Sequence, residues 1–436
     1  MSRKMKDSGI QIIGEIPDDM NVIRIKFVAN IFGRIGFRGY TQDDLVNDGE
    51  GAISLSPSNL KSFRMSYDKR TYISWSKYEE SPEIKIENGD ILFVKTGSSY
   101  GKSCIVKGLP EKATINPQLI VFKNIKCNNK YLFYLLQTSI VDAQTQWHVT
   151  GGTIPTMSQD KIENFYLPYY EDDYEQQQIV HFLDRKCTAI DTAIEKTKKS
   201  IEKLEEYKKA VITKAVTKGI DPNAKMKDSG VEWIGEMPEG WKVAKTKYLF
   251  RILKRIAGQE GFDVISITQK GLKIKDINSN EGQIAENYSN YQFVFPGDFA
   301  MNHMDLLTGW VDLSTLTGVT SPDYRVFHKI NESINDDYYK YVFQSLYFNK
   351  VYYGLAQGVA EVGRKRLQAP AFKELKLPCP PTDEPANIAT YIKDKCMAID
   401  ALIEKKQTAI NKWEEYKKSL IYYAVTGKID CRNEVI

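Results

Sequence analysis

Three polar loops in the first half of the chain carry residue types that bind nucleic acid. Their sequences are GRIGFRGY (33–40), SLSPSN (54–59) and TGSSYGKS (96–103). Arginine can grip guanine edges or phosphates, serine, threonine and asparagine can bond to phosphates and bases, and glycine lets backbone N–H groups approach a phosphate closely. Together the loops favour a DNA-binding surface, although each one taken alone is more simply a solvated turn.

Two more loops precede the strands that lead into two long predicted helices. The first is HVTGGTIPTMSQDK (148–161), and its counterpart QGVAEVGRKRL (357–367) gathers three basic residues in one place. The candidate DNA-contacting residues are Arg34, Arg38, Tyr40, Ser56, Asn59, Ser98, Ser99, Lys102, Thr153, Ser158, Lys161, His303, Arg364, Lys365 and Arg366. The strongest of these candidates are Arg34, Arg38, Lys102, Arg364 and Arg366.

The run from Gly97 to Ser103 suggests a nucleotide-binding loop, because a predicted strand precedes it and GKS closes it. That motif needs four residues between its first glycine and the GK pair, whereas three separate Gly97 from Gly101. A methyltransferase would carry a G-x-G-x-x-G fingerprint after a first strand, and none occurs in such a place. We therefore expect no nucleotide cofactor on this chain.

Hydrolytic metal chemistry also lacks support in the sequence. Glu83-Ile84-Lys85 could end a carboxylate-and-lysine nuclease motif, but two-metal hydrolysis needs converging carboxylates that the sequence does not offer. The four histidines share no ligand spacing, and the six cysteines form no CxxC pair. We predict no catalytic residue and no metal site.

The segments that we expect to position these loops occur twice in the sequence. MKDSGIQIIGEIPDDM begins at Met5 and MKDSGVEWIGEMPEGW at Met226. A second pair runs from Arg185 (RKCTAIDTAIEK, then EEYKKAVITKAVTKGID) and from Asp394 (DKCMAIDALIEK, then EEYKKSLIYYAVTGKID). Because the repeated ends enclose stretches that hardly align, we expect one scaffold that carries two different specificities.

Each long helix carries an apolar stripe with coiled-coil spacing, flanked by charge. The residues predicted to pack between the helices are Leu183, Ile190, Ile194, Ile201, Leu204, Ile392, Ile399, Ile403, Ile410, Trp413 and Leu420. Helices of about 40 residues would be ~60 Å long, and we expect them to pair antiparallel about a pseudo-two-fold axis. The alternative interpretation of such a stripe is an ordinary coiled coil that has no function beyond helix packing.

Length and composition predict a folded protein of several domains. The chain has 436 residues, 42% of them hydrophobic and 27% charged, with a net charge of +4. We predict an α+β fold in which two globular recognition domains are held apart by the antiparallel helices, with boundaries 1–170, 171–221 (central helical spacer), 222–381 and 382–436 (C-terminal helical spacer). No apolar run is long enough for a membrane span, so we expect a cytoplasmic protein.

With these features in place, the sequence resembles the specificity subunit of type I restriction-modification systems from Met5 to about Asp430. The resemblance is carried by the duplicated opening, the Gly-Asp turns before ILFVKTG and FAMNHMD, the LP and LPCPP approaches to the helices, and the copied EEYKK…AVT endings. The stretches GRIGFRGYT and GAISLSPSN are also similar to those of such recognition domains. The second domain departs from the pattern because it lacks the Gly/Ser-rich loop of the first.

The resemblance implies a non-catalytic subunit whose two target recognition domains each read half of a bipartite site in double-stranded DNA. The helices would set the spacer and dock two methyltransferase subunits, and a translocating restriction subunit would complete the complex. S-adenosylmethionine, ATP and magnesium would then belong to the partners. Two other classes remain open from the residues: a self-contained DNA-modifying or DNA-cleaving enzyme with duplicated domains, and a structural adaptor.

Overall fold

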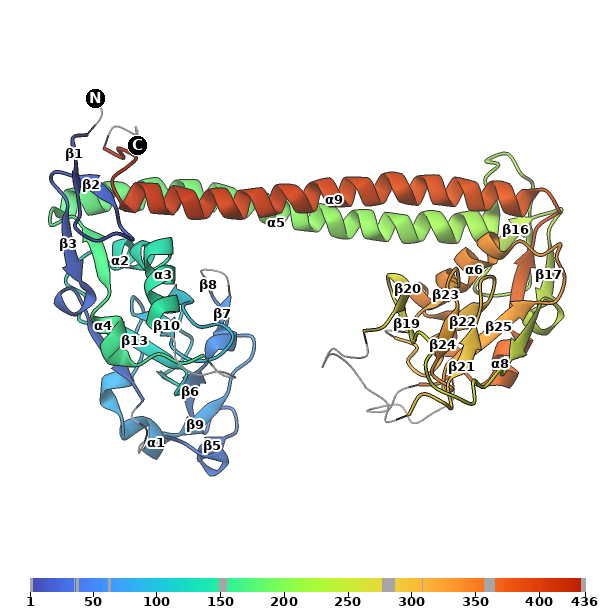
Figure 1. The fold of residues 1–436 in the computed structure, drawn as a ribbon, viewed down its shortest axis with the longest axis horizontal. Coiled ribbons are helices and arrows are strands. Elements are labelled where there is room, and N and C mark those ends of the chain that lie inside the picture. The colour runs from blue at the N-terminus through green and yellow to red at the C-terminus, as the bar shows by residue number, and fades with distance from the viewer. Residues whose placement is uncertain are drawn as a thin grey trace. The chain divides into compact units, whose positions relative to one another are not determined.

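The computed structural model describes residues 3–34, 36, 39–61, 64–148, 155–276, 287–307, 309–356 and 365–432. The chain divides into two compact units (Figure 1). Unit 1 comprises residues 1–197 and 408–436, and unit 2 comprises residues 198–407. None of the described helices is both long enough and apolar enough to cross a membrane.

The same short hairpin precedes the globular stretch of each unit, which explains the repeated MKDSG signature. In unit 1, β1 (Met5–Asp7) pairs with β2 (Glu15–Pro17), and Gly9 takes a φ of +73° while its N–H donates to Asp7 Oδ1 at 3.0 Å. In unit 2, β15 (Met226–Asp228) pairs with β16 (Glu236–Pro238), and Gly230 repeats this turn with a φ of +65°. The aspartate and glycine are therefore turn residues, since glycine adopts this conformation without steric cost.

The core of unit 1 is an antiparallel four-stranded sheet in the order β11-β10-β13-β4. Its strands are β4 (Asn30–Gly33), β10 (Ile91–Val94), β11 (Ser103–Ile105) and β13 (Leu119–Lys123). Alternate residues of β10 enter two cores: Ile91 and Phe93 pack in the core that includes the helices, and Leu92 and Val94 pack in a second core. Such a sheet is buried on both faces, which accounts for its continuous apolar runs.

Two sets of elements cover this sheet in unit 1. The first set is helical: α2 (Asn129–Leu135), α3 (Ser139–His148) and α4 (Gln159–Glu163). The second is a four-stranded sheet, β12-β6-β9-β5, made of β12 (Ala113–Ile115), β6 (Gly51–Leu55), β9 (Tyr72–Ser74) and β5 (Leu45–Val46). The small elements are β7 (Leu60–Lys61), β8 (Arg64–Met65), α1 (Trp75–Glu79), and 3-10 turns at Ile25–Phe27, Gln42–Asp44, Pro57–Asn59 and Pro82–Ile84.

Unit 2 repeats the central sheet of unit 1 with the order β18-β25-β22-β23. Its strands are β18 (Phe250–Leu253), β22 (Phe299–Met301), β23 (Val311–Leu313) and β25 (Arg325–Lys329). The helices are α6 (Asp336–Phe348), α7 (Val351–Gly354) and α8 (Ala369–Glu374), with a 3-10 turn at Thr246–Tyr248. Two further antiparallel pairs are β19 (Ile265–Thr268) with β20 (Gly271–Ile274) and β21 (Gln292–Val294) with β24 (Gly318–Thr320).

A strand pair joins the beginning and the end of each globular stretch. In unit 1, β3 (Asn21–Arg24) pairs with β14 (Tyr166–Tyr169), and in unit 2, β17 (Lys242–Lys245) pairs with β26 (Lys376–Cys379). This pairing places each LP motif directly before its long helix. The mixed helix and strand content confirms the predicted α+β class.

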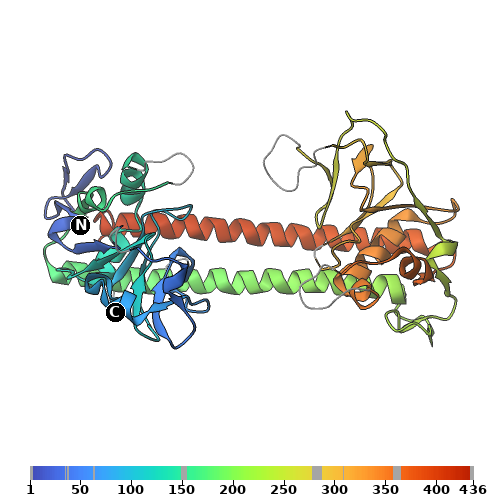
Figure 2. The same cartoon turned by 90° about the horizontal axis from the view of Figure 1, so that it is seen from below.

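The long helices are α5 (Asp173–Lys218) and α9 (Glu384–Val425), and a segment of each belongs to each unit. In unit 1, Leu183 of α5 shares a core with Leu420 and Ala424 of α9. In unit 2, Ile212 of α5 shares a core with Ile392 of α9. Figure 2 shows the two segments lying side by side within each unit.

Ion pairs connect the two helices within each unit. In unit 1, Lys417 Nζ lies 2.7 Å from Asp191 Oδ1, and in unit 2, Lys208 Nζ lies 2.7 Å from Asp400 Oδ2. In each unit, the contact partners on α9 move toward its N-terminus as the position on α5 moves toward its C-terminus. The paired segments therefore run antiparallel. The predicted packing residues Leu183, Ile194, Ile392, Ile399, Ile410 and Leu420 are buried, and Ile190, Ile201, Leu204, Ile403 and Trp413 are partly buried.

Candidate nucleic-acid interface

Backbone pairing brings two of the predicted loops together in unit 1. Thr96 forms a β-bridge with Thr156, and the two hydroxyl oxygens lie 2.8 Å apart. The N–H of Gly97 donates to the carbonyl of Pro155 at 3.0 Å, and the N–H of Met157 donates to the carbonyl of Lys95 at 3.0 Å. The loop after β10 and the segment before α4 therefore form one continuous polar edge.

The Gly/Ser-rich loop is the turn between β10 and β11. Gly97 and Gly101 have φ values of +103° and +82°, and the N–H of Gly101 donates to the carbonyl of Val94 at 2.9 Å. Ser98 and Lys102 are exposed, and Ser99 is partly exposed. A strand follows this loop, so its N–H groups belong to a hairpin turn rather than to the start of a helix.

Arg34 does not present its side chain to solvent. It is 4% exposed, its Nε donates to the carbonyl of Ile115 at 3.1 Å, and its Nη2 donates to Thr114 Oγ1 at 3.1 Å. The guanidinium lies 5.5 Å from the centre of the Tyr40 ring, and burial lowers the pKa of Arg34. Ser54 Oγ donates to the Tyr40 hydroxyl at 3.1 Å, so Arg34 and Tyr40 tie the first loop to β6 and β12.

Asn59 also has a structural role in the loop that carries it. Its Oδ1 accepts from the N–H of Ser56 at 2.9 Å, and its Nδ2 donates to the carbonyls of Ser66 and Lys69, both at 3.0 Å. Buried amides satisfied in this way hold a loop in one conformation. Ser56 remains partly exposed.

The remaining predicted residues lie in varied environments. Ser158 is exposed before α4, and Lys161 Nζ donates to the carbonyl of His148 at 3.2 Å. In unit 2, Arg366 is exposed, and Lys365 is partly buried with its Nζ 4.1 Å from the centre of the Tyr353 ring. Arg38, Thr153 and Arg364 lie outside the described residues.

Lys95 is a candidate that the sequence analysis missed. Its side chain is partly buried, and its N–H donates to the carbonyl of Gln118 at 2.9 Å. Within the described ranges, no hydrogen bond or ion pair reaches its ammonium group, and burial lowers the pKa of Lys95. In the sequence it looks like a solvated lysine at a strand end. Its equivalence to His303 after the repeated Gly-Asp turn was the available signal.

His303 occupies the corresponding place in unit 2. Its carbonyl accepts from the N–H of Leu367 at 3.0 Å, and its Nδ1 is buried without a hydrogen-bond partner among the described residues. Burial lowers the pKa of His303 to about 4, helped by the positive charges of Arg325 and Arg366. The imidazole is therefore neutral at pH 7.

Arg325 lies beside His303 and is 5% exposed. Its Nη2 donates to the carbonyl of Leu367 at 2.8 Å, and its guanidinium lies 4.7 Å from the centre of the Phe372 ring. Burial lowers the pKa of Arg325 to about 10, so the side chain keeps its charge at pH 7. Unit 2 thus has a buried positive charge beside Leu367.

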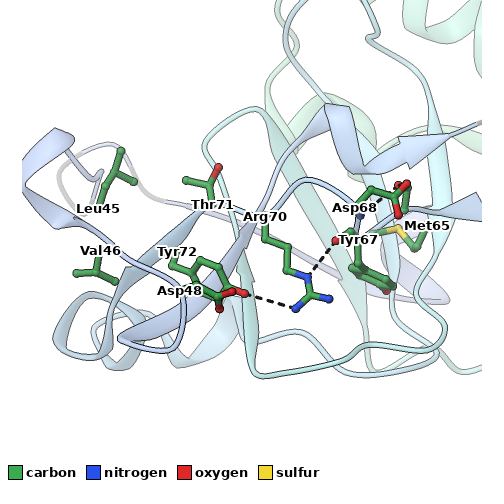
Figure 3. A pocket seen from close by; sticks show the side chains of 10 residues that line it. Leu45, Val46, Asp48, Met65, Tyr67, Asp68, Arg70, Thr71 and Tyr72 are labelled. Carbon is green, nitrogen blue, oxygen red and sulfur yellow. Dashed lines mark hydrogen bonds between the residues drawn. The ribbon is translucent and has the colours of Figure 1, made fainter. Parts of the chain in front are cut away.

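A separate pocket of about 1000 Å³ opens on unit 1 near β5 and β8 (Figure 3). Asp48 and Asp68 line it, and its Arg70 already contacts Glu111 at 2.7 Å and the Tyr72 hydroxyl at 3.5 Å. Two carboxylates and a paired arginine do not attract phosphate groups. The loops around Lys95 and His303 therefore remain the better candidate interface. In the part of the chain that the structure describes, no three His, Cys, Asp or Glu side chains gather as metal ligands.

Comparisons with known proteins agree with this arrangement. Residues 17–206 match the family described as "Type I restriction modification DNA specificity domain". The chain is 28% identical to the type I restriction enzyme MjaVIII specificity subunit of Methanocaldococcus jannaschii, over 96% of this chain and 95% of that protein. It is 26% identical to the putative type I restriction enzyme MjaX specificity subunit of the same organism, over 96% and 95%.

A solved structure is similar to this fold. It comes from work on complex assembly and conformational transition of the type I R-M system, and it matches with a TM-score of 0.64 and 12% identity, over 95% of this chain and 99% of that chain. The fold and the loops define a class of α+β protein that contains two copies of one sheet-and-helix unit. Polar loops follow equivalent strands in the two copies. Within that class, the chain is similar over 96% of its length to type I restriction-modification specificity subunits.

Proposed function

We propose that this chain is the DNA-reading subunit of a cytoplasmic type I restriction-modification complex and is itself non-catalytic. Each unit reads one half of a bipartite target in double-stranded DNA. Paired α5 and α9 hold the two recognition domains apart, set the spacer between the half-sites, and dock two methyltransferase subunits. Restriction subunits join that core. The partner subunits, and not this chain, bind S-adenosylmethionine, ATP and magnesium.

The repeated strand order with different residues at equivalent loops carries this proposal. β11-β10-β13-β4 and β23-β22-β25-β18 are the same arrangement, yet Lys95 follows β10 where His303 follows β22. A scaffold that is kept while its loops change is suited to reading two different sequences, because base edges differ in their donors and acceptors. The predicted domain boundaries, 1–170, 171–221, 222–381 and 382–436, are part of this proposal.

Exposure divides the predicted DNA contacts into two groups. Ser98, Lys102, Ser158 and Arg366 are exposed and suit phosphate or base contact, as do the partly exposed Ser56, Ser99, Lys161 and Lys365. Arg34, Tyr40 and Asn59 support the loops through the bonds described above. Arg38, Thr153 and Arg364 stay in the proposed set on sequence grounds alone.

The test is to produce the chain with its methyltransferase subunit and map methylated adenines across the host genome. We expect a single bipartite motif, and replacing residues 21–168 with another recognition domain should change only one half of it. Absence of any bipartite methylated motif would overturn the proposal. Methylation or cleavage of DNA by the isolated chain, supplied with S-adenosylmethionine or magnesium, would favour an enzyme with duplicated domains instead.

A further inference from the structure

Lys95 and His303 lie at one and the same place in the two units. Each residue follows the second strand of its sheet in chain order, β10 or β22, shortly after a Gly-Asp turn. Each main-chain carbonyl accepts a 3.0 Å hydrogen bond from the segment that enters the last short helix, from Met157 in unit 1 and from Leu367 in unit 2. The backbone around both side chains is therefore fixed in the same way.

In unit 1 this position carries an ammonium group that the described part of the chain leaves unbonded. Burial penalises the charged form, as the lowered pKa of Lys95 records. The ammonium group lies beside Gly33, where a Cβ would be 3.6 Å from Lys95 Nζ and 3.1 Å from Ile120 Cγ2. A desolvated charge without a partner is costly to folding and is typical of a site whose partner is a ligand.

In unit 2 the same position carries a neutral imidazole. Arg325 and Arg366 both disfavour a charge on His303, and Nδ1 is buried without a partner among the described residues. The positive charge that Lys95 supplies in unit 1 is supplied in unit 2 by the neighbouring arginines. A neutral imidazole has one donor and one acceptor rather than donors only, and a hydrogen bond with the main chain of Met301 already engages the ring of His303.

We propose that the Lys95/His303 position determines one base of each half-site, with Lys95 donating to the O6 and N7 acceptors of a guanine and His303 selecting a different base edge. The inference rests on the proposed function, because it requires that each unit face a DNA half-site. Lysine has three donors and no acceptor, and guanine presents two acceptors side by side in the major groove. Neutral histidine has a single N–H donor and cannot donate to both acceptors at once, so we expect the two units to select different bases at this point.

The experiment uses the complete complex with its methyltransferase subunit. The wild-type motif is first mapped in the genome, and binding is then measured to a duplex carrying that motif and to single-base variants of it. In Lys95→Met, we expect preference for one guanine of one half-site to fall roughly tenfold to a hundredfold. Every other position, including the whole second half-site, should keep its preference.

Three further variants make the result decisive. Lys95→Arg should keep the guanine preference, His303→Lys should change one letter of the other half-site, and the exposed Lys107→Met should change nothing. Uniform weakening on all duplexes in Lys95→Met would make Lys95 a phosphate contact, and unchanged discrimination would make it a structural residue. Either result overturns the inference. A wild-type complex without a bipartite motif would instead refute the proposed function.

Discussion

Positively charged side chains of the predicted interface differ in how far they are removed from water. Arg34 and Arg325 are buried and bonded to main-chain carbonyls, whereas Lys102 and Arg366 are exposed. A buried arginine that is satisfied by carbonyls holds loops in place, and an exposed one is free to meet a phosphate. Among the arginines, burial therefore separates supporting residues from contact residues.

Lys102→Ala tests the contact group. Because Lys102 is exposed on the β10–β11 turn, we expect binding to weaken similarly for all DNA sequences. Losing one phosphate contact should flatten the dependence of log affinity on log salt by about 0.9. Fluorescence anisotropy of the complex at several salt concentrations measures both effects, with Lys107→Ala as the control. A changed preference at one base would contradict a phosphate contact.

The lowered pKa of His303 makes the free energy of unfolding depend on pH. Its pKa is lowered from 6.5 to about 4, so the folded chain resists a proton that the unfolded chain accepts. This contribution is fully present above pH 6.5 and is lost as the pH falls toward 4. His303→Gln should therefore lose less unfolding free energy than the wild type between pH 6.5 and 5, measured by urea denaturation. Parallel pH profiles for the two proteins would refute this expectation.

At the scale of elements, the helices are held by apolar residues and by one repeated type of ion pair. Asp191 with Lys417 and Asp400 with Lys208 are the same pair of positions in the two copies. Their surroundings differ, because the Lys417 side chain is 5% exposed and that of Lys208 is 31% exposed. The two pairs therefore serve as a matched comparison.

Asp191→Ala should destabilise unit 1 more than Asp400→Ala destabilises unit 2. The first change leaves Lys417 buried without this carboxylate, at a cost of about 1–3 kcal/mol, whereas an exposed pair contributes about 0–1 kcal/mol. Hydrogen exchange of α9 and α5 amides near each pair measures local stability in each unit separately. Equal losses in the two variants would show that burial of Lys417 does not matter.

At the scale of the whole molecule, the proposed function links DNA specificity to a length along the helices. Under the proposed function, the recognition units determine which bases are read. The helices determine the number of unread base pairs between the half-sites. These two properties are encoded by different residues, so each should change without the other.

Lengthening the helices should alter only the spacer. Inserting one helical turn, about four residues, after Thr197 tests whether the spacer responds at all. Seven residues added after both Thr197 and Lys406 preserve the apolar stripe and lengthen it by ~10 Å. We expect roughly three more unread base pairs, at ~3.4 Å each, with both half-sites intact. Genome-wide mapping of methylated adenines reads the result. Altered letters in either half-site would contradict the separation of roles.

The amino-acid sequence by itself determined the frame of this protein. Repeated MKDSG turns, the apolar stripes of α5 and α9, and the α+β character all follow from local spacing and composition, which act over a few residues. The loops proposed as the interface were also visible as clusters of glycine, serine and basic residues. Both kinds of feature are confined to short segments, so the sequence alone contains them.

What individual side chains in those loops do depends on contacts that form when the chain folds. Arg34 was a leading candidate for DNA contact, but its guanidinium bonds to Thr114 and Ile115, 80 and 81 positions away along the chain. Lys95 looked like a solvated lysine, yet folding desolvates it beside Gly33. Burial and hydrogen bonding depend on contacts between distant segments, and only the folded chain brings those segments together.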